Sequence, residues 1–126
     1  MNRRQTLVLA LGALAAPAFA GVTKRYDQAA FDKLAAEGKP VVLAIQAPWC
    51  PTCKAQKVYI GELMAEPKYK DLTLLTIDFD HEKALLAKYK VEIQSTLIAF
   101  HGKSEVGRSV ADISKDGIDK LFSKAL

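Results

Sequence analysis

Short apolar runs alternate with helically spaced apolar residues from about residue 22 to the C-terminus. Runs at 41–45, 72–77 and 96–100 are too short for helices and rich in aliphatic residues, so they predict strands. A shorter strand is predicted at 22–26, and a tight turn at Gly102 predicts an antiparallel return strand at 106–110. Because 41–45 contains no polar residue, we expect a central strand that is buried on both faces.

Helical spacing of apolar residues predicts four helices between or after these strands. Asp27 is placed to cap the first and Ser114 the last, whereas Gly38 and Pro67 mark the ends of the first and second. The second helix starts at Cys50, and the third runs over 82–90. The predicted inward-facing residues are Ala30, Phe31, Leu34, Cys53, Ile60, Leu63, Met64, Leu85, Leu86, Tyr89, Ile118, Leu121, Phe122 and Ala125.

This order of elements predicts one α/β domain over 21–126, with a central mixed β-sheet flanked by helices on both faces. The strand at 41–45, the helix that follows it and the strand at 72–77 form a parallel crossover. Open α/β sheets carry their sites at the carboxyl ends of the strands. Cys50 lies at such an end, so we expect the site there.

The first 20 residues have the pattern of a cleaved export signal peptide. Arg3 and Arg4 precede an apolar stretch at 7–16, which is too short to span a bilayer, and Ala18 and Ala20 form a small-x-small cleavage site. The predicted location is the periplasm or another exported compartment. An uncleaved anchor is the alternative, and the segment is compatible with both the general and the twin-arginine export routes.

Removal of the signal lowers the net charge of the chain. The full sequence has 18 basic and 14 acidic residues, and two of the basic ones precede residue 21. The remaining charge of about +2 is scattered and forms no phosphate-binding stripe. We therefore expect no nucleic-acid partner.

The two cysteines of the chain, Cys50 and Cys53, lie two residues apart at the start of the predicted second helix. Free amides and the helix dipole stabilise a thiolate there, so the pKa of Cys50 is expected to fall below its ordinary value. Pro51 suits the first turn, where no N–H is needed. We expect Cys50 to be the accessible nucleophile and Cys53 to be shielded one turn into the helix.

Other chemistries fit the cysteine pair less well. A zinc site would need a second ligand pair, and His81 and His101 are too far apart in sequence to supply one. Both histidines are instead predicted to be ordinary surface or strand-end residues. A structural disulfide is also disfavoured, because it would close a loop of two residues and the stabilisation falls with loop length.

The segment 49–54, Trp-Cys-Pro-Thr-Cys-Lys behind a buried strand, resembles the active site of the thioredoxin superfamily, and the likeness runs from about residue 26 to the C-terminus. The Cys-Pro-Thr-Cys variant is similar to that of thioredoxin-like proteins of bacterial cytochrome c maturation. The resemblance implies an exported thiol–disulfide oxidoreductase, a reductase of protein disulfides, in which Cys50 attacks and Cys53 resolves. The implied substrate-contact or modulating residues are Trp49, Pro51, Thr52, Gln94, Ser95 and Thr96.

The resemblance also implies a monomer that needs no cofactor beyond the Cys50–Cys53 disulfide. Its partners would be protein disulfides and a membrane-bound or soluble electron donor, without membrane insertion after processing. Five positions depart from the family pattern, among them Val58 in place of a proline that kinks the helix and Gln46 in place of a second tryptophan. Ala44 stands in place of the family's buried Asp, and Thr76 stands in place of the lysine that pairs with this Asp. Ser95 stands in place of the cis-proline beside the disulfide. We expect proline to be accepted at position 95. These departures leave an alternative, a thioredoxin-like binding module that holds a metal, an iron–sulfur centre or a partner protein without turnover.

Overall fold

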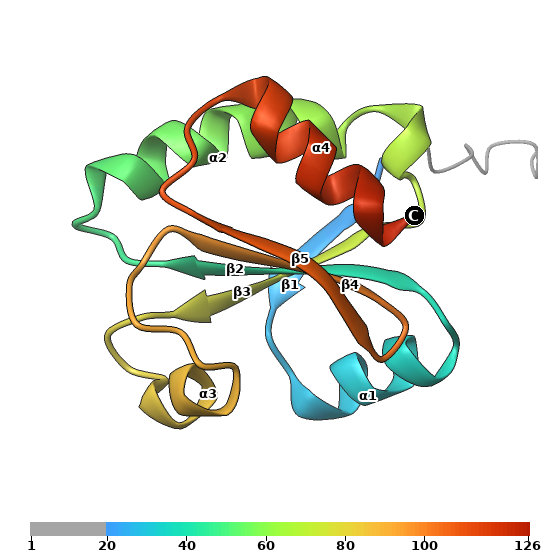
Figure 1. Ribbon diagram of the computed structural model, residues 1–126, viewed down its shortest axis with the longest axis horizontal. Helices are drawn as coiled ribbons and strands as arrows, with labels where there is room; N and C mark the ends of the chain where they lie inside the picture. Colours follow the sequence, from blue (N-terminus) through green and yellow to red (C-terminus); the bar gives the residue numbers. More distant parts are fainter. Residues whose placement is uncertain (1–19) are drawn as a thin grey trace, which may run out of the picture.

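The computed structural model describes residues 20–126 and is built around a five-stranded sheet (Figure 1). The strands lie in the order β1–β3–β2–β4–β5. Strands β1, β3 and β2 are parallel to one another, β4 is antiparallel to β2, and β5 is antiparallel to β4. The mixed sheet that the sequence predicts is therefore confirmed. The strands are β1 (Val22–Arg25), β2 (Pro40–Gln46), β3 (Thr73–Asp78), β4 (Thr96–His101) and β5 (Ser104–Val110).

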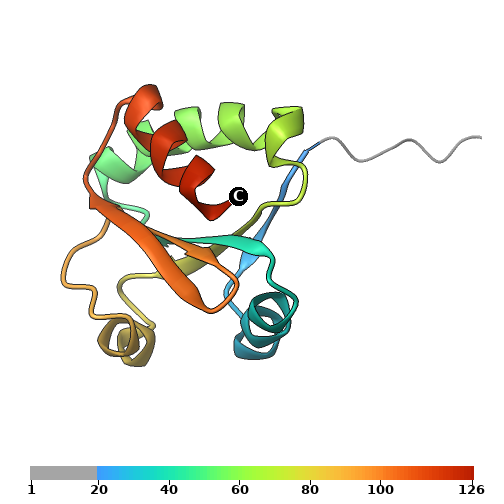
Figure 2. The same cartoon turned by 45° about the vertical axis from the view of Figure 1, so that its right-hand side comes forward.

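Helices cover both faces of the sheet, as expected. Figures 1 and 2 show α2 and α4 on one face and α1 and α3 on the other. The third helix is shorter than the predicted 82–90, because Glu82 and Tyr89 take up non-helical conformations at its two ends. The helices are α1 (Gln28–Ala36), α2 (Pro51–Met64), α3 (Lys83–Lys88) and α4 (Lys115–Ala125), with a short 3₁₀ helix, η2 (Pro67–Tyr69), after α2.

The unbroken apolar run in β2 serves two separate cores. Val42 and Ala44 face the core beneath α2 and α4, whereas Val41, Leu43 and Ile45 face the core beneath α1 and α3. All five side chains are at most 1% exposed. Because successive strand residues point to opposite faces, a strand covered on both sides has to be apolar at every position.

Polar residues set the helix ends that the sequence marks. The Asp27 carboxylate accepts a hydrogen bond from Ala30 N at 3.0 Å, and the Ser114 hydroxyl accepts one from Gly117 N at 3.1 Å. Gly38 follows α1 with a φ of +71°, a conformation that favours glycine. The two predicted N-caps are confirmed.

The predicted export signal falls on residues 1–19, which lie outside the described residues, and on Ala20. Within residues 20–126, no helix has the length and apolar character required to cross a membrane.

Phe122 tests the core that seats α2 and α4 on the sheet. Its side chain is fully buried and its ring packs edge-on against Tyr69, with centroids 5.9 Å apart. Phe122→Ala should lower the free energy of unfolding by about 3–5 kcal/mol, because it leaves a cavity. Chemical denaturation measures this loss, and Val58→Ala, at an exposed helix position, should change it by less than about 0.5 kcal/mol. Similar values for both variants would contradict this core assignment.

Candidate active site

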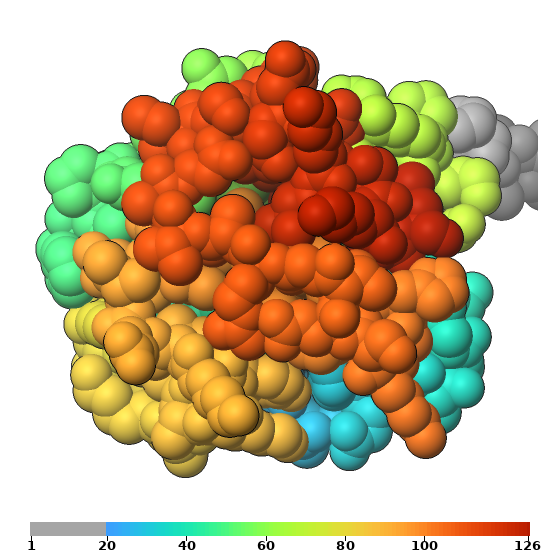
Figure 3. Space-filling view, in the orientation of Figure 1, coloured from blue at the N-terminus to red at the C-terminus, as the bar shows by residue number. Residues whose placement is uncertain are grey.

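The two cysteines lie where β2 leads into α2, and Ser95, in the segment that precedes β4, contacts them. The start of α2, in green, lies beside the segment that precedes β4, in light orange (Figures 1 and 3). Cys50 is the N-cap of α2: its backbone is extended, and its sulfur accepts a hydrogen bond from Cys53 N at 3.0 Å. Pro51 occupies the first helical position, where a missing N–H costs no intrahelical bond. The expected placement of Cys50 at a helix N-terminus is confirmed.

Ser95 contacts both sulfurs. Its hydroxyl oxygen lies 3.2 Å from Cys50 Sγ and 3.1 Å from Cys53 Sγ, and the residue is 1% exposed. A hydroxyl both donates and accepts, so it is able to accept a hydrogen bond from one thiol while it donates to the other sulfur. The side chain therefore links the two redox atoms.

The backbone of Ser95 differs from what a proline would adopt. Across residues 20–126 no peptide bond is cis, and Ser95 has a φ of +66°. Its N–H donates to the carbonyl of Ile45 at 2.9 Å. Proline has no N–H and fixes φ near −65°. The expectation that proline is accepted at position 95 is therefore wrong for this backbone, because the substitution would remove the bond to β2 and demand the opposite sign of φ.

Both thiols are free and buried. Cys50 is 1% and Cys53 3% exposed, and Ala47 and Phe79 pack against them. The expectation that Cys50 is the accessible member of the pair is wrong for this structure, whereas the shielding of Cys53 is confirmed. Sequence spacing places a residue on a helix, but the exposure of that residue also depends on which other segments pack over it. Here the Ser95 side chain contacts the Cys50 sulfur.

Burial acts against hydrogen bonding at Cys50. Burial by itself would raise the pKa of this thiol, but hydrogen bonds from the Cys53 thiol, the Ser95 hydroxyl and the Cys53 N–H outweigh it, and the net pKa is lowered. At Cys53, burial and the hydrogen bond with Cys50 raise the pKa, although Ser95 opposes the rise. Cys50 is therefore the member of the pair that ionises first.

No carboxylate lies among the buried side chains of residues 20–126. Ala44, in the place of the family's buried acid, is 1% exposed and pairs in register with Thr76 on β3. The polar side chains buried in this part of the chain are Gln56, Thr73, Ser95 and Thr96. Of these, Ser95 has a hydroxyl in contact with the sulfurs, so it is the group placed to exchange a proton with them.

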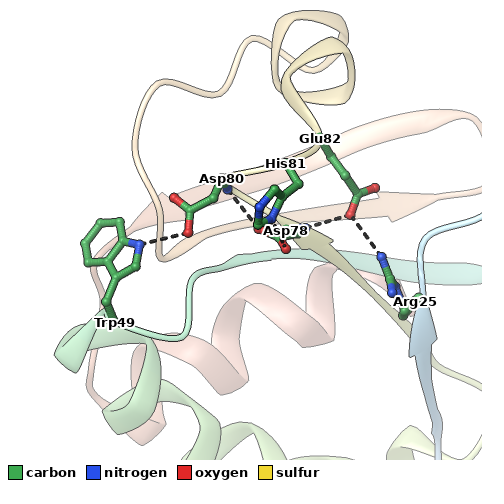
Figure 4. Close-up of polar contacts among 6 residues, drawn as sticks. All are labelled: Arg25, Trp49, Asp78, Asp80, His81 and Glu82. Carbon is green, nitrogen blue, oxygen red and sulfur yellow. Dashed lines mark hydrogen bonds and ion pairs between the residues drawn. The ribbon is translucent and has the colours of Figure 1, made fainter.

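The Trp49 side chain is hydrogen-bonded to a network of polar residues that begins at the end of β3 (Figure 4). Its indole N–H donates to the Asp80 carboxylate at 2.9 Å, and Asp80 N donates to Asp78 at 2.8 Å. The second oxygen of Asp78 lies 2.9 Å from His81 Nδ1. The hydrogen bond to His81 lowers the pKa of Asp78, and the same contact raises the pKa of His81. This network fixes the direction of an indole that is 55% exposed.

A cavity of about 240 Å³ lies beside the network and is lined by Arg25, Asp78, Glu82 and the segment 46–48, among others. Neither cysteine lines it. Ala47 lines the cavity and also packs against both cysteines, so one residue separates the cavity from the thiols.

The other predicted site residues lie near the cysteines in different environments. Pro51 is exposed and Thr52 half-buried in the first turn of α2, and the half-buried Gln94 hydrogen-bonds Cys50 and helps to lower its pKa. Thr96 is 2% exposed, and its hydroxyl donates to the carbonyl of Ile93 at 2.7 Å. A substrate contact by Thr96 is therefore not supported, because its side chain stabilises the loop from inside.

Sequence reasoning missed Gln56 and Asp80. Gln56 is 3% exposed, and its amide nitrogen donates to the carbonyls of Ser95 at 3.1 Å and Asp112 at 2.9 Å. A signal was present, since Gln56 falls between Cys53 and Ile60 on the buried stripe of the helix. No comparable signal marked Asp80, which is 31 residues from Trp49.

The two histidines are a surface residue and a strand-end residue, as predicted. His81 is exposed and paired with Asp78, and His101 ends β4 with its Nδ1 2.8 Å from the carbonyl of Ala125. Within residues 20–126, no three His, Cys, Asp or Glu side chains are grouped so that they could hold a metal ion.

A sheet of this order with a cysteine pair at the start of α2 defines a thioredoxin-like protein. The profile of the thioredoxin family matches residues 22–124, and the chain belongs to this family. Members of the family are thiol–disulfide oxidoreductases that act on protein disulfides through a redox-active cysteine pair and need no cofactor. The family assignment, the thioredoxin-like fold and the enzyme class expected from the sequence are confirmed.

Individual relatives agree with this assignment. The crystal structure of Trxlp from Edwardsiella tarda is 38% identical, has a TM-score of 0.76, and matches over 79% of this chain and 97% of its own. The thioredoxin of Chlamydia trachomatis is 36% identical over 84 residues, 67% of this chain and 80% of the relative. The thiol-disulfide oxidoreductase ResA of Oceanobacillus iheyensis is 30% identical over 96 residues, 76% of this chain, and the chain spans 48% of that relative.

Removal of the Ser95 hydroxyl should raise the pKa of Cys50, because the thiolate loses a donor while its burial remains. Ultraviolet absorbance of the thiolate, titrated against pH in reduced Ser95→Ala, measures the change. Ser109→Ala is the matched control, since the buried Ser109 hydroxyl has no hydrogen-bond partner among the described residues. If both variants titrate like the unmodified protein, the Ser95 contact does not stabilise the thiolate.

Proposed function

We propose that this protein is an exported reductase of protein disulfides that works through Cys50 and Cys53. The observation that carries the proposal is the arrangement at the sulfurs, where Cys50 caps α2 and shares the Ser95 hydroxyl with Cys53. This arrangement supports an ionised Cys50, the state in which a thiol attacks a disulfide, beside a Cys53 that keeps its proton until the resolving step.

The proposed reaction has two exchange steps. The Cys50 thiolate attacks one sulfur of a substrate disulfide, a Cys50–substrate disulfide forms, and the other substrate sulfur leaves as a thiol after it takes up a proton. Cys53 then attacks Cys50, loses its proton and releases the second substrate thiol. The substrate is reduced by two electrons, and Cys50 and Cys53 become a disulfide. Ser95, in contact with both sulfurs, is placed to relay the Cys53 proton, because its hydroxyl is able to accept that proton while it donates its own to the departing substrate sulfur or to water.

Exposed apolar side chains around the cysteines form the surface that we assign to substrate contact. Trp49 precedes Cys50, and Ile93 lies two residues before Ser95. Val110 and Ile113 flank Ala111, whose N–H donates to the carbonyl of Ser95 at 3.0 Å. A cluster of exposed apolar side chains around a reactive centre is typical of a surface that binds a polypeptide.

The direction of exchange depends on how far the reduced form is stabilised. The lowered pKa of Cys50 stabilises the reduced pair, whereas the raised pKa of the buried Cys53 acts against this stabilisation. Membership of the thioredoxin family supports a reducing protein. Equilibration with glutathione measures the potential. We expect a value nearer to about −270 mV, that of thioredoxin, than to about −120 mV, that of a strong oxidant. A potential near the second value would reverse the proposed direction.

Exchange through Cys50 should be trapped by Cys53→Ser. Without the resolving thiol, the Cys50–substrate disulfide persists, so disulfide-linked complexes should accumulate when this variant is expressed with its own N-terminal segment. Non-reducing gels and mass spectrometry detect and identify them. The double variant Cys50→Ser/Cys53→Ser is the control and should form none. Equal amounts of complex in both variants would remove Cys50 from the role of nucleophile.

Export predicts a mature protein that begins at Gly21, because Ala18 and Ala20 occupy the small-residue positions of the cleavage site. The structure supports this boundary, since Gly21 N already donates to the carbonyl of Met64 at 2.9 Å and β1 starts at the next residue. Intact-mass measurement of the exported protein checks the start. Ala20→Phe should leave the precursor uncleaved. An intact N-terminus on the unmodified protein in a membrane fraction would instead show an anchored protein.

A further inference from the structure

Gln56 is a buried polar residue in α2 that the disulfide-exchange steps do not use. It follows Cys53 by three residues, so both side chains lie on the same face of the helix. The Gln56 amide nitrogen donates to two backbone carbonyls, those of Ser95 and Asp112. One side chain therefore joins α2 to the segment before β4 and to the segment between β5 and α4.

These two segments contain strained backbone. Ser95 and Ala111 have φ values of +66° and +59°, which are uncommon for residues other than glycine and cost on the order of 1–3 kcal/mol each. They are joined by the Ala111 N–H, which donates to the carbonyl of Ser95 at 3.0 Å. Because a strained conformation persists only where its surroundings hold it, the contacts that fix this carbonyl also fix the position of the Ser95 side chain.

Helix α2 contacts Ser95 at two ends. The Cys50 and Cys53 sulfurs contact its hydroxyl, and the Gln56 amide contacts its carbonyl. We propose that Gln56 is a positioning residue of the active site, which fixes the Ser95 carbonyl and thereby keeps the Ser95 hydroxyl against both sulfurs. This inference deepens the proposed function, since it concerns the reactivity of the same cysteine pair.

The test is the thiolate titration of reduced Gln56→Met, which keeps the length of the side chain but has no donor. The pKa of Cys50 should rise, and the thiolate fraction at a pH well below the midpoint should fall about fivefold, the order of effect of one lost hydrogen bond. If Gln56 acts through Ser95, the double variant Gln56→Met/Ser95→Ala should titrate like Ser95→Ala alone. An unchanged midpoint in Gln56→Met, or an equal effect with and without Ser95, would overturn the proposal.

Tyr69→Phe is the control for a merely structural role. It also removes a donor, which bonds the carbonyl and the carboxylate of Asp119, but at the opposite end of α2 from the cysteines. We expect this variant to lower the free energy of unfolding and to leave the Cys50 titration unchanged. A shift as large as that of Gln56→Met would assign the effect to general loss of stability and so overturn the proposal.

A measurement on the unmodified protein keeps the proposal testable if Gln56→Met does not fold. Side-chain amide protons that are held on two carbonyls exchange slowly with solvent, so those of Gln56 should exchange much more slowly than those of the exposed Gln28. Equal exchange at the two residues would overturn the proposal. Neither measurement needs a substrate or a cellular compartment. A failure of Cys53→Ser to trap substrates would therefore not affect the test of Gln56. A negative result for Gln56 would likewise not affect the proposed disulfide exchange.

Discussion

The contact of the Ser95 hydroxyl with two sulfurs depends on two elements that meet at one point. The carbonyl of Ile45 at the end of β2 accepts the Ser95 N–H, and α2 supplies both sulfurs. Hydrogen bonds of this kind weaken as the distance between donor and acceptor grows or their alignment worsens. The apolar core beneath α2 and α4 is therefore part of the site, because it fixes the helix relative to the strand.

A neutral hydroxyl at this position changes the balance of charge around the thiols. A buried carboxylate near the pair would carry a second negative charge beside the Cys50 thiolate and would be costly to desolvate. Ala44 removes that charge from the core, and Ser95 contributes a neutral donor and acceptor instead. The Ser95 hydroxyl then contributes to the stabilisation of the thiolate together with the Cys53 thiol, the Cys53 N–H and Gln94, and backbone contacts hold its position.

Much of the fold was predictable because its signals are local. The apolar run in β2 follows from the burial of both its faces, and Asp27 and Ser114 cap helices through bonds to residues three positions away. The placement of Cys50 at a helix start is local too, since its sulfur accepts from Cys53 N within the same turn. The sequence by itself therefore determined the α/β class, the order of elements and the ordering of the two thiols by their tendency to ionise.

Tertiary structure decided what depends on residues distant in the chain. Ser95 is 45 residues from Cys50, and its φ, its bond to β2 and its cover over the sulfurs arise only when the sheet and α2 come together. The burial of Cys50, the support of Ser95 by Gln56 and the hydrogen bond of Trp49 to Asp80 have the same origin. Periodicity assigns a residue to an element and a face, but the atom it meets on another element is set by the packing of the whole domain.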